Sequence, residues 1–308
     1  AYMSAQIPQK FGSMPRRLRL GMVGGGAGLI GEVHANGARL SNRWELVAGA
    51  LSSNSERAKA AGKGWFLAAD RCYESYQEMA RAETQRADGI DAVAIVTPNH
   101  LHAPVALEFM ARGIDVISDK PVTARLEELG PLVAAQEKSK VFFGITYAYA
   151  SHPMLRQARE MVRAGELGDL RQIHVEYFQD WAIDLTDQAD EIPWRLDPAQ
   201  TGSSFTVADI GTHAEHLACF ASGLQIEALR ADFHVTGAAK SLEDTAFMQL
   251  RFEGGVPGTL MVSQAMAGSQ CGLRLRLCGS KASLDWCQET PESLSYRAVG
   301  QPEKILTR

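Results

Sequence analysis

The chain has 308 residues, of which 45% are hydrophobic and 22% charged, with a net charge of −5 at pH 7. This composition is typical of a globular protein with two separately packed domains, and its short apolar runs exclude membrane-spanning classes. The acidic balance gives no general attraction to nucleic acid. Residues 1–10 have no apolar stretch after a basic start, so we expect no signal peptide and a cytoplasmic location. Five cysteines without a C-x-x-C pair indicate reduced thiols.

Residues 18–31, LRLGMVGGGAGLIG, predict a buried strand that runs through a glycine loop into a helix. Within them, residues 26–31 fit G-x-G-x-x-G, a spacing that lets main-chain N–H groups and a helix N-terminus meet the pyrophosphate of a dinucleotide. A tight surface turn also needs glycines, so the motif alone does not decide the function. We expect cofactor contacts at Gly24, Gly25, Gly26, Gly28, Leu29 and Ile30.

The first half of the chain alternates strand and helix patterns. Strands are predicted at 45–51, 90–96, 114–118 and 141–146, and helices at 30–40, 55–61, 73–87, 103–112 and 126–138. Residues 90–96, IDAVAIV, are nearly all apolar, as a parallel strand covered on both faces requires. This alternation predicts a Rossmann domain over residues 15–147, an α/β fold with a doubly wound parallel sheet that binds ligands at the carboxyl ends of its strands.

The pattern changes after about residue 148. A helix is predicted at 153–164, followed by strands at 173–178, 229–235, 246–252, 259–264 and 273–278. Strands without intervening helices predict an α+β domain over 148–308 with a large, mostly antiparallel open sheet. Because helices can cover only one face of this sheet, we expect the other face to meet a second subunit in a homodimer or homotetramer.

Two motifs follow predicted strands of the Rossmann domain. The first, VTPNHLH, places Thr97, Pro98, Asn99 and His102 at a strand end, where polar groups would face a cofactor; a capped helix start is the alternative. The second is Asp119-Lys120-Pro121, in which the proline fixes the backbone after the strand and holds Lys120 at the cofactor crevice. A desolvated lysine there could serve as an acid, a base or a hydrogen-bond donor.

A third motif, DIGTH, lies in the second half. Its i, i+4 spacing places Asp209 and His213 on one face of a helix, where a carboxylate can orient an imidazole that exchanges a proton with a hydroxyl. The alternatives are a zinc site that includes His216, which we disfavour because no H-E-x-x-H motif is present, and a capped helix with incidental histidines. We expect no metal.

The end of the second strand bears on the choice of cofactor. NAD enzymes usually carry an acidic residue there to bind the ribose 2′-hydroxyl, but residues 51–54 read LSSN. Ser52, Ser53 and Arg57 could receive a 2′-phosphate, so we expect NAD or NADP, with NADP tolerated or preferred. The alternative is that Ser53 or Asn54 caps the next helix while NAD binds.

The motifs GMVGGGAGLIG, VTPNHLH, ISDKP and ADIGTHAEHL, in this order, resemble the glucose-fructose oxidoreductase and inositol dehydrogenase family, Gfo/Idh/MocA. The resemblance covers nearly the whole chain; at residues 119–121 the family more often has Glu-Lys-Pro. It implies hydride transfer between a nicotinamide and a carbinol carbon of a sugar, cyclitol or related polyol. It also implies that Lys120 and His213 are the catalytic pair and that Asp209 is the partner of His213. By the same resemblance Trp194 and Arg195 lie near the active site, and we expect both to contact the cofactor.

Two departures from the family and two rival functions stay open. The phosphate loop is enlarged by extra glycines and Ala27-Gly28, and the chain stops at Arg308 without the closing helix of many members, as a short member or a truncated chain would. The rivals are a non-catalytic dinucleotide-binding regulator and a family member that cleaves glycosides through transient oxidation. The identity of the polyol lies in pocket side chains that the sequence does not place.

Overall fold

The computed structural model describes residues 16–26 and 28–308. Residues 1–10, where we expect no signal peptide, and Ala27 of the glycine motif lie outside the described residues. The chain forms two compact units: the first comprises residues up to Thr97, Pro104–Ser118 and Leu132–Gly144, and the second comprises Pro98–Ala103, Asp119–Pro131 and Ile145–Arg308. The division at residue 147 stays a prediction. No helix of the described chain is long and apolar enough to cross a membrane.

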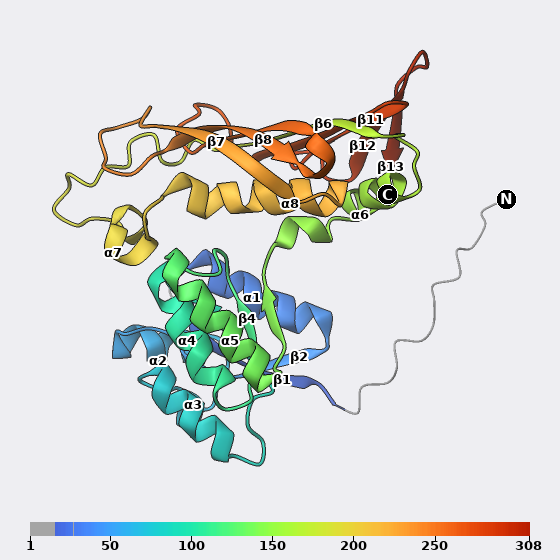
Figure 1. Cartoon of the computed structure of the whole chain (residues 1–308). Helices are drawn as coiled ribbons and strands as arrows, with labels where there is room; N and C mark the ends of the chain where they lie inside the picture. Colours follow the sequence, from blue (N-terminus) through green and yellow to red (C-terminus); the bar gives the residue numbers. More distant parts are fainter. Residues whose placement is uncertain (1–15, 27) are drawn as a thin grey trace. The chain divides into compact units, whose positions relative to one another are not determined.

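The first unit is built on a five-stranded sheet with the order β2-β1-β3-β4-β5, flanked by helices (Figure 1). Its elements are β1 (Leu18–Gly24), α1 (Leu29–Ser41), β2 (Trp44–Ala50), α2 (Ser55–Gly64), α3 (Tyr76–Gln85), β3 (Ala92–Val96), α4 (His102–Met110), β4 (Asp115–Ser118), α5 (Leu129–Ser139) and β5 (Phe143–Ile145). The pairs β1–β2, β1–β3 and β3–β4 are parallel. The doubly wound sheet is therefore confirmed, and the strand order reverses between β1 and β3, where such folds bind ligands.

Capping residues set the ends of the helices in this unit. Asn54 caps α2 by accepting a hydrogen bond from the N–H of Arg57, so the asparagine and not a serine opens this helix. Ser75 caps α3 in the same way, which is why the helix expected from residue 73 begins only at Tyr76. Asn42, in the left-handed conformation, ends α1.

The second unit is an eight-stranded sheet with the order β13-β12-β11-β10-β6-β9-β8-β7. Its elements are α6 (Pro153–Arg163), β6 (Leu170–Phe178), α7 (Pro198–Thr201), α8 (Thr212–Ser222), β7 (Ile226–His234), β8 (Thr245–Phe252), β9 (Pro257–Ser263), β10 (Gly272–Gly279), β11 (Ala282–Cys287), β12 (Ser293–Ala298) and β13 (Lys304–Thr307). Only β6 and β9 pair in parallel among the described strand pairs of this sheet, so the mostly antiparallel sheet is confirmed.

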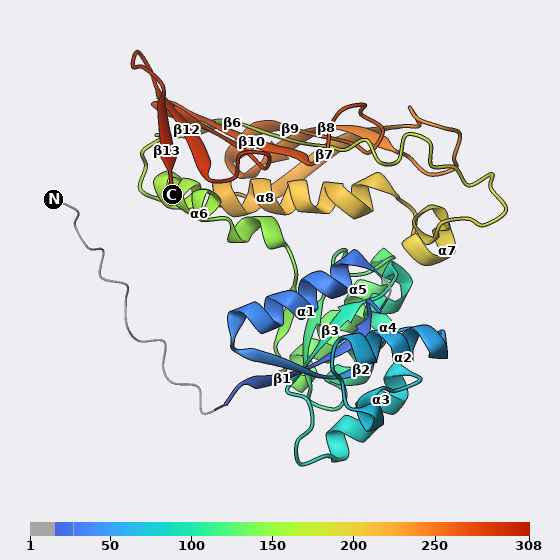
Figure 2. The ribbon, with the colours of Figure 1, turned by 180° about the vertical axis from the view of Figure 1, so that it is seen from behind.

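Helices α6 and α8 lie along one face of this sheet (Figures 1 and 2). The leucines of β10, Leu273, Leu275 and Leu277, are at most 2% exposed and belong to the core beneath these helices. The alternating Arg274 and Arg276 lie on the opposite face, whose side chains no helix of the second unit's described residues covers. The period-two pattern of the sequence thus gives one packed and one open face, as expected.

Candidate functional site

The glycine loop after β1 is shaped by close backbone contacts. Gly24 and Gly25 have positive φ angles of 79° and 77°, which favour glycine. A Cβ on Gly24 would lie 2.5 Å from the carbonyl oxygen of Val96, and a Cβ on Gly31 would overlap the backbone of Gly25. These glycines are therefore required for the loop to pass β3 and for α1 to start against it.

The start of α1 is open where a dinucleotide would need access. A Cβ on Gly28 would meet no atom within 4 Å. Gly28 is the N-cap of α1 and offers no side chain to bond the N–H groups of the first turn. Leu29 and Ile30, the first two helical residues, are 74% and 40% exposed. The glycines described in this loop, followed by an exposed helix N-terminus, fit the pyrophosphate of a nicotinamide dinucleotide.

The end of β2 carries hydroxyl groups and a capping amide. Ser52 Oγ accepts the N–H of Asn54 at 3.1 Å, and Asn54 in turn caps α2. Ser53 and the side chain of Arg57 are exposed. The alternative that Asn54 caps the helix is thus confirmed, while Ser53 and Arg57 stay accessible to a ribose or its 2′-phosphate.

Two residues expected to contact the cofactor have buried side chains that bond within the protein. The amide nitrogen of Asn99 donates to the carbonyl oxygen of Thr201 at 2.9 Å, and Nδ1 of His102 lies 2.6 Å from the carbonyl oxygen of Pro121. Asn99 is 5% exposed and His102 1%. The geometry favours a supporting role for both side chains, because they tie the VTPNHLH segment to other parts of the second unit.

Lys120 and Asp209 form the polar centre of the second unit. Nζ of Lys120 donates to Oδ1 of Asp209 at 2.7 Å and to its carbonyl oxygen at 2.5 Å. The peptide bond between Lys120 and Pro121 is cis. Burial alone would raise the pKa of Asp209, but the charges of Lys120 and Arg195 and hydrogen bonds from Lys120 and Gln264 lower it to about 2. Asp209 is therefore a permanent carboxylate at physiological pH.

Arg195 brings a second cation to this carboxylate. Its Nε lies 4.0 Å from Oδ2 of Asp209, and its guanidinium lies over the ring of Trp194 at 4.4 Å and that of Trp181 at 5.8 Å. Such stacking on indole faces fixes the plane of an arginine. The structure thus places the Trp194-Arg195 pair beside the Lys120–Asp209 cluster.

His213 is held by aromatic rings. The rings of Tyr147 and Tyr149 meet it edge-on, with centroids 5.9 and 4.9 Å away. Burial and the charge of Lys120 lower the pKa of His213 to about 3, although Asp209 opposes the shift. The imidazole is therefore neutral near pH 7. Its Nδ1 is buried and has no hydrogen-bond partner among the described residues.

The structure corrects the expectation that Asp209 orients the imidazole of His213. Asp209 lies in a π-helical turn, Val207–Gly211, which precedes α8. The carboxylate bonds Lys120 and Gln264 instead. Sequence reasoning missed Gln264, because a single glutamine at the end of a strand carries no local signal.

A zinc site at these residues finds no geometric support. Among residues 16–26 and 28–308, no group of three histidine, cysteine, aspartate or glutamate side chains is arranged to hold a metal ion. His216 stacks on Tyr147 with ring centroids 4.2 Å apart, so its ring packs against an aromatic neighbour.

Comparison with known proteins agrees with both units. Residues 18–147 match the family model described as an oxidoreductase family with an NAD-binding Rossmann fold, and residues 155–285 match the GFO/IDH/MocA C-terminal domain. An uncharacterized oxidoreductase of Bacillus subtilis, YfiI, is 35% identical over 94% of this chain and 76% of its own. Solved structures of an inositol dehydrogenase homolog from Azotobacter vinelandii, complexed with NAD+ or with NADH and myo-inositol, are 33% and 32% identical. They cover 96% of this chain and 77% and 76% of theirs, with TM-scores of 0.91 and 0.88.

The fold, the glycine loop and these matches define an oxidoreductase class with an NAD-binding Rossmann unit. The chain belongs to the Gfo/Idh/MocA family, which confirms the resemblance first seen in its motifs.

Proposed function

We propose that the protein is an NAD(P)-dependent dehydrogenase that oxidises a hydroxyl-bearing carbon of a sugar, an inositol or a related polyol. The observation that carries the proposal is the Lys120–Asp209 pair, together with the neutral imidazole of His213, whose Nδ1 has no hydrogen-bond partner among the described residues and whose pKa the charge of Lys120 lowers. These groups are the ones that alcohol oxidation needs, because the reaction removes a proton from oxygen as well as a hydride from carbon.

The chain's own residues would hold the substrate oxygen and move its proton. The chemistry that a bound nicotinamide supplies is acceptance of the hydride. In the described contacts Lys120 Nζ donates twice to Asp209, which leaves a third N–H to donate to the substrate oxygen. The unpartnered Nδ1 of His213 would accept the hydroxyl proton. Asp209 would act by fixing the ammonium group of Lys120 and not by carrying a proton itself.

The names of similar proteins support the polyol class. The Azotobacter vinelandii homolog was solved with NADH and myo-inositol, and an inositol 2-dehydrogenase from Corynebacterium glutamicum is 28% identical over 59% of this chain. The test is reduction of NAD and NADP, followed by absorbance, with a panel of cyclitols and aldoses. We expect turnover with at least one of them.

Other results of this assay would favour the rivals. Cofactor binding without turnover on any polyol would contradict the proposal and favour a regulator. Release of free sugar from a glycoside without net NADH would favour cleavage through transient oxidation.

Substitution of the catalytic pair gives a sharper prediction. Removal of a general acid or base typically costs a factor of 10² to 10⁴ in rate, so Lys120→Ala and His213→Ala should each lower kcat by roughly that factor. Because both groups serve one transition state, the double variant should lose far less than the product of the two factors. Steady-state kinetics with the preferred polyol measures this, and calorimetric titration with the cofactor is the control. A folded His213→Ala enzyme with near wild-type kcat would remove the acid/base assignment.

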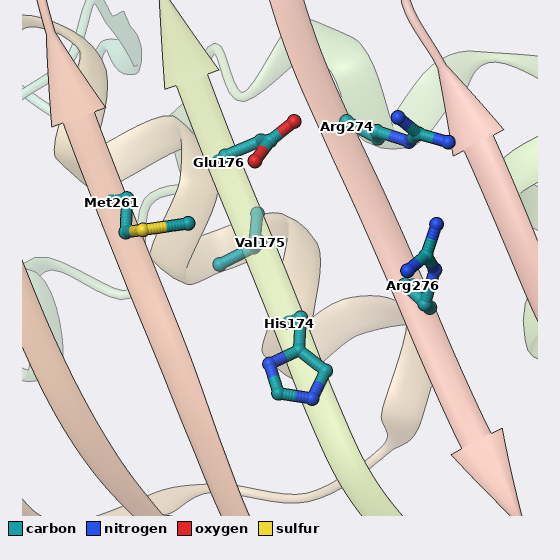
Figure 3. A pocket seen from close by; sticks show the side chains of 6 residues that line it. All are labelled: His174, Val175, Glu176, Met261, Arg274 and Arg276. Carbon is teal, nitrogen blue, oxygen red and sulfur yellow. The ribbon is translucent and has the colours of Figure 1, made fainter.

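We also propose that the protein assembles as a homodimer or homotetramer through the open face of its second-unit sheet. Figure 3 shows His174 and Glu176 of β6 between Met261 of β9 and the arginines of β10, where these side chains line a pocket on this face. Arg274 and Arg276 are 45% and 47% exposed, although both bond Asp285 of β11. A face that carries both charge signs and apolar groups can complement a second copy of itself.

A further inference from the structure

The buried side chain of Gln264 forms hydrogen bonds with the π-helical turn that contains Asp209 and with the residue before this turn. Gln264 follows β9 and is 0% exposed. Its Nε2 donates to Oδ2 of Asp209 at 2.7 Å, while its Oε1 accepts the hydroxyl proton of Thr206 at 2.9 Å. Thr206 immediately precedes the turn Val207–Gly211 and is also 0% exposed. One amide thus bonds a residue before the turn and a residue within it.

The orientation of this amide is fixed by its neighbours. The carboxylate of Asp209 can only accept hydrogen bonds, so the atom of Gln264 that faces it must be the nitrogen. The second N–H of Gln264 donates to Oε1 of Gln179 at 3.1 Å. That atom must be oxygen, because Trp181 Nε1, which can only donate, bonds it at 2.9 Å. Both N–H bonds and the carbonyl of Gln264 are therefore used in a single arrangement.

The main chain of Gln264 is held as firmly as its side chain. Its N–H donates to the carbonyl of Asp244 at 2.9 Å, and its carbonyl accepts the N–H of Ala182 at 3.0 Å. These main-chain hydrogen bonds hold the backbone from which the side-chain amide extends to Asp209. The two donors thus bind different oxygens of the carboxylate, Gln264 at Oδ2 and Nζ of Lys120 at Oδ1.

We propose that Gln264 is a positioning residue of the active site, which holds one carboxylate oxygen of Asp209 so that the other fixes the ammonium group of Lys120. The role rests on the proposed dehydrogenase function, in which Lys120 contacts the substrate oxygen. A residue that fixes the orientation of a catalytic group, without contacting the substrate itself, affects the rate of the chemical step more than it affects cofactor binding.

Two substitutions test this role. Gln264→Leu removes the donor to a carboxylate, and loss of such a charge-assisted bond should lower kcat roughly tenfold to a hundredfold while cofactor affinity stays unchanged. Gln264→Glu gives a more specific signature, because its protonated carboxyl can donate to Asp209 as the amide does, whereas its ionised form repels that carboxylate. Two carboxyl groups in contact share one proton, so the pair should titrate above the usual carboxylate range.

The expected result is a pH-dependent defect in Gln264→Glu. The groups that face Asp209 are Lys120 after β4, Arg195 beside α7, His213 on α8 and Tyr149 before α6, and all are the same in variant and wild type. The ratio of variant to wild-type kcat should be highest near pH 5.5 and fall at least tenfold by pH 8.5. Gln225→Glu, at an exposed position of the same unit, is the matched control and should keep a constant ratio.

Crystal structures of wild type and Gln264→Leu provide a readout that does not depend on turnover. We expect the Lys120 Nζ–Asp209 Oδ1 distance to exceed hydrogen-bond range in the variant. A constant kcat ratio for Gln264→Glu, or an intact Lys120–Asp209 pair in Gln264→Leu, would overturn the positioning role. If wild type turns over no polyol, the dehydrogenase proposal fails, while the structures still decide whether Gln264 positions Asp209.

Discussion

Asp209 keeps its negative charge at a mostly buried position because cations and donors surround it. Lys120 donates to Oδ1, Gln264 donates to Oδ2, and the guanidinium of Arg195 lies 4.0 Å from Oδ2. Together they lower the pKa of the carboxyl to about 2 although burial opposes this. A group that stays ionised over the working pH range cannot exchange protons with a substrate. At the scale of single residues, the site therefore combines the permanent carboxylate of Asp209, the ammonium group of Lys120 bonded to it, and the neutral imidazole of His213.

The lowered pKa of His213 predicts a pH dependence of stability. The folded value is about 3, mainly because of burial, against ~6.5 in the unfolded chain. Between these values the unfolded chain binds a proton that the folded protein does not, so stability falls as pH decreases from about 6.5 toward 3. His213→Gln has no titrating ring and should lose about 2 kcal/mol less than wild type between pH 7 and pH 5.

Thermal unfolding of both proteins at pH 7, 6 and 5 measures this difference. The same substitution at the 43% exposed His234 controls for the loss of a surface imidazole. Parallel curves for His213→Gln and wild type would show that His213 is not held neutral by the fold.

The choice of cofactor is a second residue-scale prediction. The exposed Ser53 and Arg57 lie beside the α2 cap, where a 2′-phosphate could form charge-assisted hydrogen bonds. We expect NADP to bind at least as well as NAD and Arg57→Ala to weaken NADP binding about tenfold, near 1.4 kcal/mol, without changing NAD. Titration of both dinucleotides measures it, with Arg39→Ala, an exposed arginine at the end of α1, as the control. NAD binding tenfold tighter than NADP in wild type would refute the preference.

Sequence motifs indicated which residues to examine but not how they pair. Lys120 stood out because Pro121 follows a predicted strand end, and Asp209 because of its i, i+4 spacing with His213. The bond between them spans 89 positions, and that of Gln264 with Asp209 spans 55. Such pairings depend on the packing of the sheet and on a π-helical turn, neither of which a local pattern specifies.

At the scale of elements, the segment before α8 shows how tertiary contacts set local structure. The buried Glu243 accepts the N–H of Val207 at 3.1 Å and the hydroxyl proton of Ser204 at 2.5 Å. Ser204 in turn accepts the N–H of Ala208. A carboxylate from a distant loop thus caps the start of the π turn. The sequence indicated a regular helix here, because the motif DIGTH gives no sign of the hydrogen bonds that Glu243 forms with Ser204 and Val207.

The strands of the second sheet were predicted unevenly. Long alternating segments such as β6, β8 and β10 were found from their period-two pattern. The last three strands, β11 to β13, were missed, because each has only four to six residues with mixed polar and apolar side chains. Their pairing with β10 and with one another, and not local preference, makes them strands.

Two glycines at the start of α1, Gly28 and Gly31, should respond differently to substitution by alanine. A methyl group on Gly31 would overlap the backbone of Gly25, whereas one on Gly28 would meet open space. Gly31→Ala should therefore destabilise the protein by about 1 to 3 kcal/mol, the usual cost of overpacking. Gly28→Ala, whose φ of −123° suits any residue, should leave stability nearly unchanged. Chemical denaturation of the two variants measures the contrast, and equal stabilities would mean that the loop does not pack against α1 as described.

At the scale of the whole molecule, the second unit pairs a packed sheet face with an open one. Helices α6 and α8 cover the first face (Figure 2). The open face combines Glu176, Arg274 and Arg276 with Met261 and the 46% exposed Phe247. A sheet of eight strands with its apolar and charged groups left in water is typical of a surface that another chain covers.

The assembly prediction follows from this open face. We expect wild type to sediment as a homodimer or homotetramer at micromolar concentration. Met261→Asp should shift it toward the monomer, because Met261 and Glu176 line the same pocket and the proposed contact would bury a second carboxylate beside Glu176. Leu40→Asp, at an 87% exposed position of the first unit, should leave the sedimentation unchanged. High salt should weaken the assembly if the arginine and carboxylate groups of two copies pair across it. A wild-type monomer at micromolar concentration, or a Met261→Asp variant that sediments as wild type does, would place the subunit contact elsewhere or remove it.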